Sequence, residues 1–342
     1  MAASKTGAVI TWMKSAGGLT VTLSIITAIA AGIHSGPYII VNTIVTGGML
    51  ALVAMGLALI FGVLNIPMFA HGEFFMIGSL TAYYIFTPLA EYLSTSPSTL
   101  LAAVAPLIAI FGAVLAGTLG GVLCELLIFS QLRKRSSENW VMNSFLLTVG
   151  LSVVLVNAHQ LLFGTEFKGI VRYWGGRPLE IMGVFVSRDR ILAFVISMFV
   201  VILFWLFMKY TNTGRAIRAV SQDQTGALMV GININGILML TMALGCMLSA
   251  IAGASLLFLY PSYPAVGMEP LYLAWFVVIL VGLGNTAFAL VGGFIVALLK
   301  ALTVEYFGAG WDFVIPSLLI VFVLVFKPSG LFGSEVRGVL DL

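Results

Sequence analysis

Residues 38–63 read YIIVNTIVTGGMLALVAMGLALIFGV, a run without one charged side chain. About 20 predominantly apolar residues are enough to cross the hydrocarbon core of a bilayer as a helix. The run also lacks the alternation of apolar and polar residues that marks the strands of a membrane barrel. It therefore predicts a membrane-spanning helix.

The composition of the whole chain agrees with a membrane location. Of its 342 residues, 61% are hydrophobic and 8% are charged, whereas soluble domains carry roughly 25% charged residues. So few charges cannot cover a water-facing surface. Because only helices and closed barrels satisfy their backbone groups inside a bilayer, the sequence predicts an all-α, polytopic membrane helix bundle.

About ten segments meet the length criterion for a span, although the eighth is short. They lie near residues 17–35, 38–63, 72–92, 101–128, 141–163, 189–208, 234–257, 270–283, 286–303 and 313–327. The segments between them are too short to bury a core of their own. Residues 1–342 are therefore expected to form a single transmembrane domain.

The first segment has a second interpretation. Lys5 and Lys14 precede an apolar stretch, Leu19–Ile33, which contains the small-residue sequence Ala-Ile-Ala. Such a pattern also resembles a cleaved signal peptide. Cleavage would leave nine spans and would not change the orientation of the later ones, so both interpretations stay open.

The distribution of basic residues predicts the orientation of the bundle. If the N-terminus is cytoplasmic, the inner set is Lys5, Lys14, Arg133, Lys134, Arg135, Lys209, Arg215, Arg218, Lys327 and Arg337, and the outer set is Lys168, Arg172, Arg177, Arg188 and Arg190. The positive-inside rule then favours both termini in the cytoplasm. Loop 164–190 becomes external and loop 209–235 cytoplasmic. The external loop is either a docking surface for a partner or an interfacial loop anchored by Tyr173 and Trp174.

Several classes of function are disfavoured. Cys124 and Cys246 lie inside apolar runs and the three histidines are far apart, so neither a disulfide nor a metal site is expected. We find no nucleophile with a base and no posed carboxylate pair, which disfavours an enzyme. The chain lacks a phosphate-binding Gly-x-x-x-x-Gly-Lys-Ser/Thr sequence, so no nucleotide cofactor is expected. The net charge of +3 gives no reason to expect a nucleic-acid partner. Glu125 is expected to form an ion pair with a residue of the basic cluster 133–135.

A polar interruption lies at residues 65–75, which read NIPMFAHGEFF. Pro67 removes a backbone donor and Gly72 loosens the chain, so the helix should break there and turn backbone groups toward a cavity. The alternative is an ordinary cytoplasmic turn, near the inner end of the bundle, in which His71 and Glu73 cap helix ends.

A second interruption, GLGNT at residues 282–286, separates two short spans. Aligning Asn285 with Asn65 also brings Gly292 onto Gly72. The match is either an internal repeat of the kind many transporters contain or a coincidence.

The longest of these polar interruptions is the loop at residues 209–235. Gly214 can end the preceding helix, Arg215–Leu228 can form a short helix, and Gly231 can end that element. The residues that would share one face of this helix are Ala216, Ala219, Val220, Asp223 and Ala227. Small residues on one face permit a partner to approach closely. Alternatively, the basic residues of the loop anchor the chain at the anionic inner leaflet.

The loop carries a family resemblance. Residues 214–233, GRAIRAVSQDQTGALMVGIN, closely resemble the cytoplasmic coupling-loop motif of branched-chain amino acid ABC transporter permeases. FAHGEFFMIG at 69–78, the Gly- and Ala-rich run 243–257 and KPSGLFG at 327–333 are similar to the same family. Together these stretches cover most of the chain from about residue 40 to the end.

The resemblance implies roles for two sets of residues. The ATPase-docking element would be formed or positioned by Gly214, Arg215, Arg218, Ala219, Ala227, Gly231 and Ile232, together with Asp223 of the predicted face. The translocation path would be lined or supported by Asn65, Pro67, His71, Gly72 and Glu73, with Gly284 and Asn285 at the second interruption.

The resemblance also implies partners, a location and a mechanism. Such permeases pair with a second homologous permease subunit, two cytoplasmic ABC ATPases and an external solute-binding protein, in the plasma or inner membrane of bacteria or archaea. ATP is bound by the partners, and transport proceeds by alternating access. The spans offer too few polar groups for a dedicated zwitterion site, so selectivity is expected to rest with the binding protein.

Two departures leave the substrate open. Met68 stands where the family usually has Asn, and Val-Gly-Leu-Gly-Asn at 281–285 replaces a common Gly-Gly-x-Gly-Ser/Thr turn. A urea or short-chain amide permease of the same plan is therefore an alternative. A different class, an ion-coupled secondary transporter or a channel, would need an intramembrane carboxylate or a pore ring.

Overall fold

The computed structural model describes residues 16–96, 98–135, 140–174, 177–181 and 183–333. Ten long helices correspond to the ten segments expected from the sequence. They are α2 (Ala16–His34), α3 (Tyr38–Leu64), α4 (His71–Thr95), α5 (Thr99–Cys124), α7 (Trp140–Phe163), α8 (Arg188–Tyr210), α11 (Ile234–Ser255), α12 (Met268–Val281), α13 (Ala289–Phe307) and α14 (Val314–Phe326). The predicted helical membrane bundle is confirmed.

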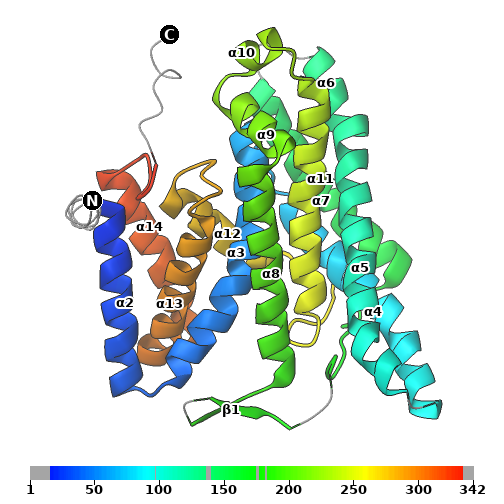
Figure 1. Ribbon diagram of the computed structural model, residues 1–342, viewed down its shortest axis with the longest axis vertical. Helices are drawn as coiled ribbons and strands as arrows, with labels where there is room; N and C mark the ends of the chain where they lie inside the picture. The colour runs from blue at the N-terminus through cyan, green and yellow to red at the C-terminus, as the bar shows by residue number, and fades with distance from the viewer. Residues whose placement is uncertain (1–15, 97, 136–139, 175–176, 182, 334–342) are drawn as a thin grey trace.

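The shorter elements lie at the two ends of the bundle (Figure 1). A π-helical turn (Glu125–Phe129) continues α5 into α6 (Ser130–Arg135), and α9 (Asn212–Gln222) and α10 (Gln224–Met229) lie at the same end, which we call the loop end. A two-stranded antiparallel hairpin of β1 (Leu179–Ile181) and β2 (Val184–Val186) lies at the opposite end, which we call the hairpin end. A 3₁₀ turn (Ala309–Trp311) precedes α14.

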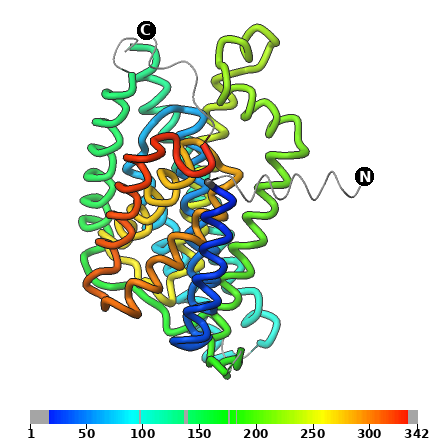
Figure 2. Tube along the Cα trace, turned by 90° about the vertical axis from the view of Figure 1, so that its left-hand side faces the viewer, coloured from blue at the N-terminus to red at the C-terminus, as the bar shows by residue number. Residues whose placement is uncertain are grey.

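Within the described residues, eight helices are long and apolar enough to cross a membrane. The remaining two long helices are α4 and α12, and α12 has only 14 residues. Of these two, α12 packs against α3, the central helix of the bundle, whereas α4 packs against α5 and α11. The ribbon and the tube views show a bundle whose two ends differ, with α9 and α10 projecting from one of them (Figure 2).

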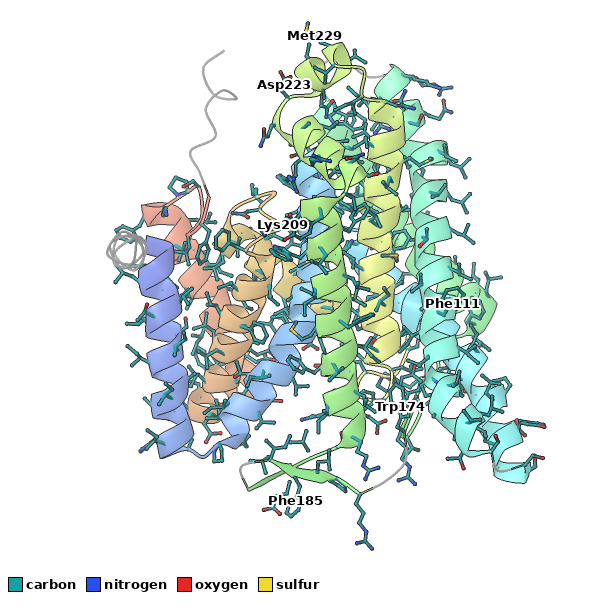
Figure 3. The ribbon with its side chains drawn as sticks, viewed as in Figure 1. Phe111, Trp174, Phe185, Lys209, Asp223 and Met229 are labelled. Carbon is teal, nitrogen blue, oxygen red and sulfur yellow. The ribbon has the colours of Figure 1, made fainter. Side chains whose placement is uncertain are left out.

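The helices at the centre and at the edge of the bundle differ in burial. The hydrophobic spans of α3 and α11 are 83% and 72% buried, whereas those of α7 and α14 are each 11% buried. Side chains of the outer helices, such as Phe111 on α5, point away from the bundle (Figure 3). Apolar side chains on an outer face are what a lipid environment requires.

The central helices α3 and α11 cross where each carries a glycine. A Cβ atom on Gly56 would lie 2.6 Å from the carbonyl oxygen of Gly245. Small residues at such crossings let two backbones approach closely, which is how membrane helices gain packing without a hydrophobic driving force.

The bundle contains an inverted internal repeat. The order helix, break, helix, helix occurs in α3, 65–70, α4 and α5 and again, running in the opposite direction, in α11, 256–267, α12 and α13 (Figure 1). In each case the last helix packs along the first helix of the other unit, because α5 lies on α11 and α13 lies on α3. Of the two interpretations of the Asn65–Asn285 match, coincidence is therefore the right one, because Asn65 precedes α4 while Asn285 follows its counterpart, α12.

We expect Gly56→Ala to destabilise the bundle, because the added methyl group has no room at the crossing of α3 and α11. Overpacking of this kind costs about 1–3 kcal/mol. The unfolding midpoint of the purified protein in detergent, followed by intrinsic fluorescence, measures the effect. Gly150→Ala in α7 is the matched control, because no described atom lies within 4 Å of its new Cβ. Equal midpoints for the two variants would contradict the crossing.

Candidate coupling loop and translocation path

The loop at residues 209–235 begins with a capped helix. The Thr211 hydroxyl accepts a hydrogen bond from the Gly214 amide over 2.9 Å, so a new helix, α9, starts directly after α8 ends at Tyr210. Gly214 therefore lies in the first turn of α9, and the expectation that it ends the preceding helix was wrong. Its hydrogen atom faces α8, where a Cβ would lie 2.5 Å from the Phe207 carbonyl oxygen.

Asp223 divides the helix expected at Arg215–Leu228 into two. Its backbone is extended (φ −154°, ψ 107°), and its carboxylate accepts a hydrogen bond from the Thr225 amide over 2.9 Å. Aspartate competes in this way with helical hydrogen bonding and favours a cap. The single helix was therefore wrong, and α10 follows α9 at a bend. Gly231, with φ at 81°, ends the element as expected.

The small-residue face of α9 packs on the bundle itself. Gly214, Ile217 and Val220 are buried, and α9 contacts α3, α8 and α11. Ala216 and Ala219 are half-buried. The Arg218 guanidinium donates to the Met208 carbonyl oxygen, which ties α9 to the end of α8. The face that the sequence offered to a partner is therefore used largely within the chain.

Three consecutive exposed apolar residues, Leu228, Met229 and Val230, form what we call the tip of the loop. These three side chains are 62%, 82% and 76% exposed. Figure 3 shows Met229 at the outermost point of the loop end, beyond Asp223. Exposed apolar clusters with a polar rim commonly mark protein contacts. Sequence reasoning missed the tip, although three consecutive apolar residues in a polar loop were a usable signal.

The break between α3 and α4 lies inside the bundle. Asn65 ends α3 in the left-handed conformation (φ 55°), and Ile66, Met68 and Ala70 are fully buried. His71 Nε2 donates to the Val53 carbonyl oxygen over 3.1 Å. Val53 lies three helical turns before the end of α3, roughly 16 Å along the axis at 1.5 Å per residue. The chain therefore runs back into the bundle before α4 begins.

Side-chain hydroxyls from two other helices donate hydrogen bonds to backbone carbonyl oxygens at this break. Thr148 of α7 donates to the Pro67 carbonyl oxygen over 3.0 Å, and Ser249 of α11 donates to the His71 carbonyl oxygen over 3.0 Å. Ser152 of α7 donates to Glu73 Oε1 over 2.8 Å. The expectation that Glu73 lies near the inner end was wrong, because the carboxylate is buried in the middle of the bundle.

The two breaks of the inverted repeat meet at their backbones. A Cβ on Gly72 would lie 2.4 Å from the Gly267 carbonyl oxygen, so the starts of α4 and α12 touch. From this contact α4 runs toward the hairpin end and α12 toward the loop end (Figure 1). Each of the two helices carries a glutamate in its first turn, Glu73 and Glu269.

Gly284 and Asn285 lie elsewhere, at the loop end. Gly284 packs on Gly62 of α3, and Asn285 Nδ2 donates to the Phe332 carbonyl oxygen over 3.1 Å. Both residues line a cavity of about 210 Å³ together with Arg218 of α9. The structure therefore groups these two residues with the loop at residues 209–235 and separates them from His71, Gly72 and Glu73.

Among the described residues, ion pairs form at two places in the bundle. The expected pair of Glu125 with the basic cluster is confirmed, because Arg133 binds the buried Glu125 carboxylate. Sequence reasoning missed the second contact, in which Lys300 of α13 binds Glu269 and lies 3.5 Å from Asp312. These residues are 12 or more positions apart in the chain, so no local sequence pattern could predict that they pair.

The loop at residues 164–190 is tied to the bundle at its hairpin end. Asp189 Oδ1 accepts hydrogen bonds from the Tyr173 and Trp174 amides over 3.0 and 2.8 Å. The Tyr173 hydroxyl donates to the Ala254 carbonyl oxygen over 2.7 Å. Burial raises the pKa of the Tyr173 phenol, so it stays a neutral donor. Phe185 of the hairpin remains exposed (Figure 3).

An inverted repeat of membrane helices, with breaks inside the bundle and a projecting loop at one end, is the architecture of a transport permease. Residues 39–324 match the family described as branched-chain amino acid transport system / permease component. The chain belongs to this family. It is a multi-pass membrane permease.

Individual relatives agree with this assignment. The chain is 31% identical over 307 residues to the high-affinity branched-chain amino acid transport system permease protein BraD of Pseudomonas aeruginosa, covering 88% of this chain and 97% of the relative. It is 26% identical to the corresponding protein LivH of Escherichia coli, covering 87% and 96%. A probable LivH of Methanocaldococcus jannaschii is 24% identical over 87% and 92%. No solved structure matches the chain significantly.

We expect Asp223→Ala to loosen α10, because the helix loses its cap. The loss of a cap costs about 1 kcal/mol, which corresponds to roughly fivefold faster opening. Hydrogen–deuterium exchange of peptides covering residues 224–230 measures this change. Asp223→Asn is the matched control, because asparagine caps a helix about as well as aspartate. Equal exchange in all three proteins would show that Asp223 does not hold α10.

Proposed function

We propose that the chain is the membrane-spanning subunit of an ATP-driven importer that translocates branched-chain or related amino acids. Family membership supports the transport role, and the names of the relatives supply the substrate class. The observation that supports transport driven by a partner ATPase is the projecting loop with its exposed apolar tip. A permease without a nucleotide motif needs such a surface to receive work from a partner.

In this proposal a cytoplasmic ABC ATPase docks on the loop end. The tip of Leu228, Met229 and Val230 enters the partner, and the coupling residues position it. These residues are Gly214, Arg215, Arg218, Ala219, Asp223, Ala227, Gly231 and Ile232. Arg215 is exposed, whereas Arg218 and Ala227 hold the loop on the bundle. ATP is bound by the partner.

The remaining partners follow from the orientation that we propose. Both termini are cytoplasmic, in the inner or plasma membrane of a bacterium or archaeon, because basic residues concentrate on that side of the spans. The hairpin end then faces the external solute-binding protein. A second homologous permease subunit completes the membrane part, as the family resemblance implies.

Alternating access links the loop to the breaks. Arg218 ties α9 to α8 and lines the same cavity as Gly284 and Asn285, so movement of α9 reaches the start of α13. Since α13 packs along α3, this movement changes the packing around the breaks. ATP can shift this equilibrium only by as much as the ATPase contacts differ between the two states.

The breaks support the path in this mechanism. Asn65, Pro67, His71, Gly72 and Glu73 form the turn inside the bundle whose hydrogen bonds run to α3, α7 and α11. A change in the packing of those helices therefore changes the hydrogen bonds that hold this turn. Gly284 and Asn285 lie at the loop end of the same chain of contacts, where α9 meets the segment before α13.

Family membership and the names of the relatives favour the proposed function over the alternatives. An ion-driven transporter needs an intramembrane carboxylate that is free to bind an ion. Among the described residues Glu125 is held by Arg133 and Glu269 by Lys300. Glu73 accepts a hydrogen bond from Ser152 at Oε1, while its buried Oε2 has no hydrogen-bond partner among the described residues. The named relatives transport branched-chain amino acids rather than urea or amides.

We expect Met229→Glu to abolish co-purification of the ATPase subunits and ATP-dependent leucine uptake, because it puts a charge into an apolar contact. Uptake into proteoliposomes and the subunit ratio on a gel measure the two effects. Thr225→Glu is the matched control, since it adds the same charge to α10 away from the tip, near the helix start where acids are favourable. Normal co-purification of the Met229→Glu variant would refute the docking surface.

A further inference from the structure

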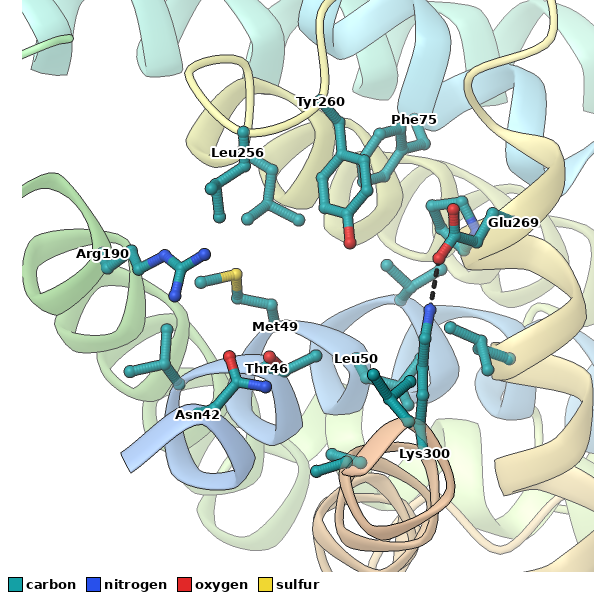
Figure 4. A pocket seen from close by; sticks show the side chains of 18 of the residues that line it. Asn42, Thr46, Met49, Leu50, Phe75, Arg190, Leu256, Tyr260, Glu269 and Lys300 are labelled. Atoms are coloured by element: carbon teal, nitrogen blue, oxygen red, sulfur yellow. Dashed lines mark hydrogen bonds and ion pairs between the residues drawn. The ribbon is translucent and has the colours of Figure 1, made fainter. Parts of the chain in front are cut away.

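A cavity of about 330 Å³ lies in the half of the bundle toward the hairpin end. It is enclosed by α3, the start of α8, the break at 256–267, the start of α12 and α13 (Figure 4). Pockets that bind small molecules measure roughly 300–1,000 Å³. The cavity therefore has the size for a small solute, and it adjoins the point where the two breaks meet.

Arg190 is the unusual residue of this cavity. It belongs to the first turn of α8, is half-buried, and in Figure 4 its guanidinium points into the cavity. Within the described part of the chain, this guanidinium has neither a hydrogen bond nor an ion pair. An unpaired cation in a membrane bundle is costly and indicates function. A guanidinium matches a carboxylate through two parallel hydrogen bonds.

Neutral polar groups lie on the adjoining wall. Asn42 and Thr46 are one helical turn apart on α3 and line the cavity on the same face. Figure 4 shows both on the side of the cavity where Arg190 lies. The amide oxygen of Asn42 and the hydroxyl oxygen of Thr46 can accept hydrogen bonds from an ammonium group.

On the wall opposite Arg190, the charged side chains are paired with each other. Glu269 is held by Lys300, so among the described residues this side of the cavity offers no unpaired charge (Figure 4). Between the two walls the lining is mostly apolar and includes Met49, Leu50 and Leu256. The described lining thus combines an unpaired cation, two neutral acceptors beside it and an apolar interior.

We propose that this cavity binds an aliphatic α-amino acid during translocation. The carboxylate binds Arg190, the ammonium group binds Asn42 and Thr46, and the aliphatic side chain packs against Met49 and Leu256. This inference rests on the proposed function and assigns a substrate site to it. The expectation that the spans hold too few polar groups did not account for residues that separate segments bring together.

The test measures occupancy of the cavity by thiol protection. Ala301→Cys places a reporter on the cavity wall, and the native Cys124 and Cys246 are buried. The complete transporter, purified with its partner subunits into nanodiscs, is labelled with a maleimide at increasing concentrations of leucine. We expect leucine to slow labelling, 4-methylpentanoate to protect more weakly, and leucinamide, which lacks the carboxylate, not to protect.

Two variants in the reporter background test the assigned contacts. Arg190→Met should raise the leucine concentration for half-protection about tenfold or more, because a charge-assisted hydrogen bond is lost. Asn42→Leu should remove the advantage of leucine over 4-methylpentanoate. Arg188→Met is the matched control, because Arg188 is exposed and donates to the Arg177 carbonyl oxygen outside the cavity.

Uptake measured on the same preparation separates the two proposals. ATP-dependent leucine uptake without leucine protection, or protection that Arg190→Met leaves unchanged, would overturn the site and leave the proposed function intact. Protection without uptake would support the site and contradict the proposed function. Slow labelling that needs Arg190 but no leucine would mean that a lipid phosphate occupies the guanidinium, which also overturns the site.

Discussion

Inside a bilayer, every backbone group that leaves a helix must find its partner within the protein, because no water is there to replace it. The break at 65–70 meets this constraint with hydroxyls from Thr148 and Ser249, which bind carbonyl oxygens of the turn. The second break meets the first through Gly72 and Gly267. Neither break could exist without the helices around it.

This constraint explains the layout of the functional regions. Because α4 and α12 start from one contact inside the bundle and run to opposite ends, the helices around that contact enclose space on the hairpin side, where the cavity with Arg190 lies. On the other side, α12 leads to the segment with Gly284 and Asn285, which adjoins the coupling loop. One contact thus separates the region that would hold a solute from the region that would receive work.

The sequence predicted the fold well because apolar length is a local property. The run at 38–63 and its nine counterparts each show a span without any knowledge of their neighbours. The sequence also showed where the polar loop at residues 209–235 lies, but Asp223 changed its form, because a cap formed by one side chain outweighed the helical pattern on either side. Boundaries that depend on a single hydrogen bond are poorly determined by periodicity.

The cavity could not be predicted in the same way. Arg190 was counted with an external loop, and Glu269 and Lys300 stood near the ends of separate spans. They meet only because α12 and α13 of the second repeat unit, and α8 outside the repeat, all pack around α3. Likewise, Glu73 was placed near the inner end of the bundle. The depth to which the 65–70 segment returns depends on the His71–Val53 contact, which no local pattern encodes.

Because Arg218 ties α9 to α8 and α13 packs along α3, we expect work received at the loop end to change access to the cavity at the hairpin end. The most direct test is the labelling rate of Asn42→Cys, a cavity residue, by a membrane-impermeant maleimide in the assembled transporter, with and without vanadate-trapped nucleotide. We expect the labelling rates with and without trapped nucleotide to differ by about tenfold or more, as for a population shift of at least about 1.4 kcal/mol. An unchanged rate in a preparation that hydrolyses ATP would contradict it.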